Sequence, residues 1–134
     1  MGLRESTIDV DAVSPIPASL ASAVVEVAHE QGLADTWLNA RAAAWRPRTL
    51  EERTCTPLLV RDSLVVLGVS ADALLLMKLT RANEVDQADI RRVWPLCTFE
   101  TAEQVVTSYY EAFPAEAPDP HLVDFVESLI GTVE

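Results

Sequence analysis

The sequence predicts an α+β protein: a small mixed sheet packed with helices, followed by a helical C-terminal half. Three observations support this class. An N-terminal segment alternates polar and apolar residues that favour strands, two short β-rich runs follow in mid-chain, and the second half consists of helical segments with capping residues. We expect a single domain over residues 1–134, with the strand, helix and hairpin in 1–69 and the helical part in 70–134.

The first predicted elements are a strand and a helix. Residues 6–13 favour a strand, because β-formers alternate with polar residues through Ile8-Asp9-Val10-Asp11. The prolines that follow break the strand, and Pro17 is placed to open a helix over 18–31 that ends at Gly32. A second helix is predicted over 35–45, with an aspartate as N-cap and a proline beyond its end.

The middle and the end of the chain predict a hairpin and then helices. Residues 58–60 and 64–69 are β-rich and flank the polar turn residues 61–63. Ser70 is a candidate N-cap for the first helix that follows, and the last helix is expected to start with Asp119 as N-cap and Pro120 as first residue, after a linker over 114–120. The helix predicted over 99–113 is led either by Thr98 or by a Thr101-x-x-Gln104 capping box. The predicted helices cover 71–81, 85–93, 99–113 and 120–131.

Composition excludes several classes of protein. The formal charge of −11 disfavours a protein that binds a nucleic-acid backbone broadly, since that requires a basic surface. Cys55 and Cys97 are far apart, which indicates reduced thiols in a cytoplasmic protein rather than a disulfide framework or zinc site. We expect no membrane span and no secretion signal, because the sequence has neither a run of 18 apolar residues nor a basic, then apolar, N-terminus.

Half of the ten basic residues lie in one stretch, which has two interpretations. The stretch forms either a local basic patch on an acidic body, or a surface where arginines pair with Glu51, Glu52 and their neighbours. We favour the ion-paired surface, because such pairs are common. The arginines are Arg41, Arg46, Arg48, Arg53 and Arg61.

Asp9 and Asp11 are the first candidate site residues. On a strand, side chains two residues apart leave the same face, with their backbones ~6–7 Å apart. Two such carboxylates suit Mg²⁺, which binds oxygen ligands and is commonly held by one or two carboxylates together with substrate phosphates. The alternative is a strand edge with two solvated aspartates, and an Asp-x-Asp pattern alone favours that alternative.

Four ordered motifs extend this observation. The run Arg4-Glu5-Ser6-Thr7-Ile8-Asp9-Val10-Asp11 resembles the Asp-x-Asp strand of the DNA polymerase β nucleotidyltransferase superfamily, in particular its AbiEii-type and toxin–antitoxin branch. Trp37-Leu38-Asn39, the helix Ser70 to Leu79 and the segment Glu84 to Ile90 are similar to later elements of that family, in the same order. The resemblance covers residues 4–90.

The resemblance implies roles for particular residues. Asp9 and Asp11 match the family's metal ligands, Lys78 matches a helix lysine near the nucleotide phosphates, and Asp86 matches an active-site aspartate, with Asp89 in the same motif. It implies Mg²⁺ as cofactor and a nucleoside triphosphate as substrate. The residues alone leave open a snorkelling Lys78 and an Asp86 that stabilises a helix N-terminus.

The sequence also departs from the family. Only eight residues precede Asp9, so the Gly-Ser turn that holds the triphosphate in relatives is missing, and Val85 stands where the last motif has arginine. We therefore expect a nucleotidyltransferase-like protein, with a truncated fold, that is weak or inactive as this chain. The alternative is a non-catalytic interaction or dimerisation module, with a homo-oligomer or partner protein, because a missing strand exposes a sheet edge. A natural start upstream of Met1 is the third possibility.

Overall fold

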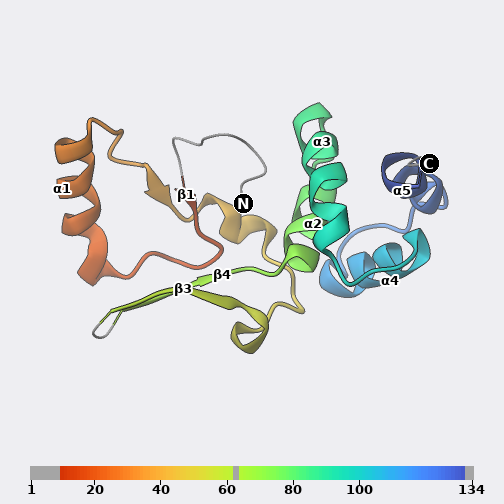
Figure 1. Cartoon of the computed structure of the whole chain (residues 1–134), viewed down its shortest axis with the longest axis horizontal. Coiled ribbons are helices and arrows are strands. Elements are labelled where there is room, and N and C mark those ends of the chain that lie inside the picture. The colour runs from red at the N-terminus through yellow and green to blue at the C-terminus, as the bar shows by residue number, and fades with distance from the viewer. Residues whose placement is uncertain (1–9, 62–63, 132–134) are drawn as a thin grey trace. The chain divides into compact units, whose positions relative to one another are not determined.

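Residues 10–61 and 64–131 are described by the computed structural model, which has a mixed architecture of helices and two small sheets (Figure 1). This confirms the predicted α+β class. The chain forms two compact units, Met1–Arg46 and Pro47–Glu134. The hairpin therefore belongs to the same unit as the C-terminal helices, whereas the sequence had grouped it with the N-terminal strand.

The first unit contains the predicted N-terminal helix. A short 3-10 turn, η1 (Ala18–Leu20), leads into α1 (Ala21–Gln31). Gly32 ends α1 in the left-handed conformation, with φ of 68°, and its amide donates to the Ala28 carbonyl. Glycine adopts this conformation without a steric penalty, so the predicted stop is confirmed.

The predicted helix over 35–45 is wrong. Two short strands, β1 (Val10–Asp11) and β2 (Leu38–Asn39), pair in parallel instead, and a 3-10 turn, η2 (Arg41–Trp45), follows. The Val10 amide donates to the Trp37 carbonyl at 2.6 Å. Trp37 is also fixed by its indole N–H, which donates to the Val24 carbonyl of α1 at 2.8 Å. These contacts between distant segments override the helical propensity of the alanine-rich stretch.

The second unit begins with the hairpin. Before it lies the short 3-10 turn η3 (Glu52–Thr54). Strands β3 (Thr56–Arg61) and β4 (Leu64–Gly68) pair antiparallel, as predicted, with an irregularity between Pro57 and Leu59. In the described chain these two strands form a sheet of their own and do not pair with β1, contrary to the single mixed sheet that we expected. The central turn residues 62 and 63 lie outside the described ranges.

Helices make up the rest of the second unit, and their N-termini follow local capping rules. Ser70 caps α2 (Ala71–Leu79) by accepting from the Ala73 amide, and Asn83 caps α3 (Glu84–Val93). The turn η4 (Trp94–Leu96) follows α3. Thr101, rather than Thr98, caps α4 (Ala102–Ala112), which settles the alternative left open by the sequence. Each cap satisfies an amide that has no partner within its helix.

The last helix starts later than predicted. The α5 helix (Leu122–Ile130) has His121 at its N-cap position, whereas the sequence predicted Asp119. Asp119 instead closes the preceding turn, where its Oδ1 accepts from the His121 amide at 2.9 Å. Aspartate forms such local turns as readily as helix caps, so residue type alone did not place the helix start.

The core of the second unit lies between its helices. Figure 1 shows α2 and α3 side by side, with α4 and α5 grouped beside them. All four helices contribute buried apolar side chains, and none of the described hairpin side chains is buried. The core residues with the least exposure are Leu75, Ile90, Val93, Val105, Ala112 and Val126.

Candidate functional site

Of the two predicted metal ligands, Asp9 and Asp11, the structure describes Asp11. Asp9 lies outside the described residues. Asp11 lies on β1 in the first unit and is exposed. The other predicted site residues, Lys78 and Asp86, belong to the second unit. Within residues 10–61 and 64–131, no three or more His, Cys, Asp or Glu side chains form a group that could hold a metal ion.

The second unit brings three of the predicted residues together in one ionic cluster. The Lys78 ammonium of α2 lies 2.9 Å from Asp89 Oδ2 and 3.8 Å from Asp86 Oδ1, both on α3. The Arg81 guanidinium also reaches Asp86 Oδ1, at 2.9 Å. Asp86 and Asp89 are three residues apart on one helix, so they present both carboxylates to the same side.

Both carboxylates are removed from water. Asp86 is 0% exposed and Asp89 1% exposed, whereas the Lys78 side chain retains 17%. A buried carboxylate is costly unless it is paired and hydrogen-bonded. Here Lys78, Arg81 and Arg92 surround the pair, with Arg92 Nη1 3.9 Å from Asp89 Oδ1. We therefore interpret the cluster as the ionic link between α2 and α3.

Asp86 has a second role in the start of α3. Its amide donates to Asn83 Oδ1 at 2.9 Å, and its Oδ2 accepts from the Asn83 amide at 3.3 Å. This reciprocal arrangement is a capping box, which satisfies two amides at the helix N-terminus. The sequence left open whether Asp86 is an active-site residue or a helix N-terminal charge, and its geometry supports the second role.

Lys78 lies in neither of the two environments considered from the sequence. It does not extend to solvent as a snorkelling side chain, because its amine lies against two buried carboxylates. An amine that binds phosphate must have its positive charge available to the ligand, and here that charge is matched by aspartates. This geometry is one of helix attachment rather than of anion binding.

The arginine-rich stretch contains at least one of the predicted surface ion pairs. Arg53 contacts Glu51 through two hydrogen bonds of 3.0 and 3.1 Å. The pair is exposed, and Arg53 lowers the pKa of the Glu51 carboxyl through its hydrogen bond and its charge. Arg46 instead donates to Ser14 Oγ at 2.6 Å. These arginines therefore organise local structure within their own units.

The β3–β4 hairpin exposes apolar side chains, a feature that was not predicted for these strands. The exposed fractions of Leu58, Val60 and Val65 are 68%, 66% and 53%. The signal was present in the sequence, because Leu58-Leu59-Val60 and Leu64-Val65-Val66-Leu67 are continuous apolar runs. Strands with one solvated face alternate apolar and polar residues, whereas strands covered on both faces do not.

Neither sequence nor fold comparison identifies a relative. Within the described part of the chain, none of the helices has the length and apolarity needed to span a bilayer. Comparison with protein families, with curated proteins and with solved structures finds no match to this chain.

Proposed function

We propose that this chain is a non-catalytic interaction module that pairs with a second copy of itself through the β3–β4 hairpin. The observation that carries the proposal is the exposure of apolar side chains on both strands. Fully burying one valine or leucine stabilises by about 1.5–3 kcal/mol. Burying this partly exposed set between two copies would therefore stabilise a dimer considerably. The six side chains are Leu58, Leu59, Val60, Leu64, Val65 and Val66.

Both faces of the hairpin are apolar. The register pairs Leu59 with Val66 and Val60 with Val65, and successive pairs point to opposite faces. A two-stranded hairpin is marginally stable in water, and a sheet of three or more strands is the usual minimum. Pairing with additional strands would therefore stabilise this hairpin.

The two outer edges differ, and the difference selects a mode of pairing. β3 contains Pro57, which has no amide hydrogen, and Arg61, and both are typical of a protected edge. The described β4 residues include neither proline nor charge. Antiparallel pairing of β4 with β4 of a second copy gives a symmetric four-stranded sheet, with the proline-bearing strands outside.

The test compares two matched valine substitutions. Val65 on β4 and Val85 on α3 are 53% and 55% exposed, and Val→Glu at either position adds the same charge. We expect the unmodified chain and Val85→Glu to be dimers in light scattering at micromolar concentration, and Val65→Glu to be a folded monomer by circular dichroism. A monomeric unmodified chain, or a Val65→Glu dimer of unchanged affinity, contradicts the proposal.

A second candidate is Mg²⁺-dependent nucleotidyl transfer from a nucleoside triphosphate. What favours it is the ordered set of motifs over residues 4–90 that resembles nucleotidyltransferases, with Asp9 and Asp11 at the positions of the metal ligands. Because Asp86 and Asp89 match the charge of Lys78, we expect little or no transfer. The assay uses labelled nucleotides with Mg²⁺. Robust transfer that is lost in Asp9→Asn and retained in Asp35→Asn would establish this function instead.

A further inference from the structure

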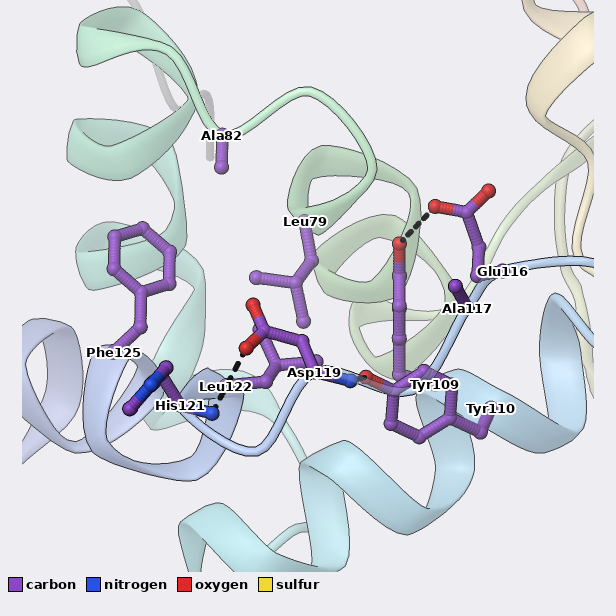
Figure 2. A pocket seen from close by; sticks show the side chains of 10 residues that line it. All are labelled: Leu79, Ala82, Tyr109, Tyr110, Glu116, Ala117, Asp119, His121, Leu122 and Phe125. Carbon is purple, nitrogen blue, oxygen red and sulfur yellow. Dashed lines mark hydrogen bonds between the residues drawn. The ribbon is translucent and has the colours of Figure 1, made fainter.

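A cavity of about 470 Å³ lies in the second unit, between the C-terminal part of α4 and the start of α5 (Figure 2). Tyr109, Tyr110 and Phe125 supply aromatic rings, and Leu79 supplies an apolar surface. In Figure 2, Phe125 lies on one side of Leu79 and Asp119, and Tyr109 lies on the other. A volume of this size accommodates a small ligand or one long side chain of a partner.

The aromatic rings are held in place by their neighbours. Tyr109 is 5% exposed, and its ring lies 5.4 Å from those of Tyr110, edge to face, and of Phe113. The Tyr109 hydroxyl donates to Glu116 Oε1 at 3.2 Å, and the Tyr110 hydroxyl accepts from the Asp119 amide at 2.7 Å. The two tyrosine rings are therefore fixed before a ligand arrives, which limits the entropy lost on binding.

Two carboxylates lie at the rim. Glu116 and Asp119 are exposed. Glu116 uses one oxygen to accept from the Tyr109 hydroxyl of α4, and Asp119 uses one to accept from the His121 amide. A carboxylate accepts several hydrogen bonds, so both retain capacity for a donor. The described residues that line the cavity include no lysine or arginine, and their one basic side chain is that of His121.

We propose that this cavity binds an organic monocation, an alkylguanidinium or alkylammonium group. Aromatic faces attract such cations through their quadrupole, most strongly for partly desolvated groups within about 6 Å of the ring centroid. Glu116 and Asp119 supply negative charge and hydrogen-bond acceptors, while Leu79 contacts the alkyl stem. The net charge of −11 adds a long-range attraction for cations. This inference is independent of hairpin pairing.

The experiment is a calorimetric titration of the full chain with three probes. They are n-butylguanidinium, its uncharged analogue n-butylurea, and a blocked glycine-rich peptide with one arginine. We expect saturable binding of n-butylguanidinium and at least roughly tenfold weaker binding of n-butylurea. If only the arginine peptide binds, the ligand is an arginine side chain of a protein. If the peptide and n-butylguanidinium bind comparably, the site recognises the alkylguanidinium group that they share.

Three variants identify the site. Asp119→Asn and Glu116→Gln retain the hydrogen-bond acceptors, and each should weaken n-butylguanidinium binding roughly fivefold. Glu111→Gln is the control, because Glu111 is exposed on α4, does not line the cavity, and undergoes the same charge change. Equal binding of n-butylurea, an equal loss in Glu111→Gln, or no saturable binding of either cation below about 10 mM overturns the proposal.

Discussion

At the scale of single residues, burial changes the chemistry of two side chains more than their sequence context indicates. Cys97 is half-buried after η4, and burial, followed by the Asp72 carboxylate, raises the pKa of its thiol to about 12. Asp72 is itself held by Thr98, whose amide donates to Asp72 Oδ1 at 2.8 Å and whose hydroxyl donates to Asp72 Oδ2. Cys97 is therefore a structural thiol.

Alkylation rates test this assignment of Cys97. Because the thiolate is the nucleophile, and an unfolded cysteine has a pKa near ~8.5, the native thiol should react about two to three orders of magnitude more slowly than the denatured one at pH ~8. Mass spectrometry after iodoacetamide treatment measures both rates, with Cys55 as internal reference. Asp72→Asn should speed the native reaction. Equal rates for native and denatured Cys97 would contradict the assignment.

Tyr109 is the second such residue. Burial, and then the Glu116 carboxylate, raises the pKa of the Tyr109 phenol to about 12, from an ordinary value near ~10. The folded state thus holds this proton more tightly than the unfolded state. The corresponding stability is fully present below pH ~10 and is lost as the pH rises towards 12.

An alkaline titration measures this shift. The chain has two tyrosines, so in Tyr110→Phe the phenolate absorbance reports Tyr109 alone. We expect that absorbance to appear near pH 12 in the folded protein and near pH ~10 in urea. In parallel, the urea midpoint of the unmodified chain should fall more steeply between pH 10 and 12 than that of Tyr109→Phe. Titration of folded Tyr109 at its ordinary pKa would show that the phenol is not buried in solution.

At the scale of elements, the link between α2 and α3 is ionic as well as apolar. Leu75 and Ile90 are each 1% exposed, and the Lys78–Asp89 pair lies beside them on the same two helices. Buried ion pairs often contribute little compared with apolar replacements, but losing one partner leaves the other charge buried. The cluster therefore makes the helix pair sensitive to single substitutions.

A single variant and a double variant test this sensitivity. Lys78→Met leaves Asp89 buried with weaker compensation, so we expect the free energy of unfolding to fall by about 3–5 kcal/mol. The combined Lys78→Met and Asp89→Leu variant should recover most of that loss, because both charges are removed together. Urea denaturation measures each variant. A Lys78→Met protein of unchanged stability would show that the amine is solvated and available to a ligand.

Local capping explains which elements could be predicted from the sequence. Each cap acts within one turn of chain. Gly32 sets the C-terminus of α1, and Ser70 and Thr101 set the N-termini of α2 and α4. The stretch 35–45 has the composition of a helix, but Trp37 and Asn39 find partners on distant segments instead. Such pairing depends on tertiary contacts that a local pattern does not contain.

The site shows the same limit. Lys78, Asp86 and Asp89 could be selected from the sequence because they fall in motifs that resemble nucleotidyltransferases, and they do lie together. Their mutual pairing could not be predicted, because it depends on how α2 packs against α3. The cavity near Tyr109 was also missed, since its carboxylates lie in a linker whose path depends on tertiary contacts to α4.

At the scale of the whole molecule, charge and apolar surface act in opposite directions. The chain carries a net charge of −11, which repels a second copy, while the β3–β4 hairpin favours association. The described hairpin strands hold Arg61 as their charged residue, so the repulsion comes from the rest of the chain. It acts over distances comparable to the screening length, about 10 Å at 0.1 M salt.

Salt should therefore strengthen self-association. We expect the dimer dissociation constant to fall as NaCl rises from about 0.05 to 0.5 M, because screening weakens the repulsion between copies while hydrophobic burial is retained. Sedimentation equilibrium across this range measures the effect, and Val65→Glu should stay monomeric throughout. A dimer that dissociates as salt rises would indicate attraction between opposite charges, and a hairpin that is not the contact surface.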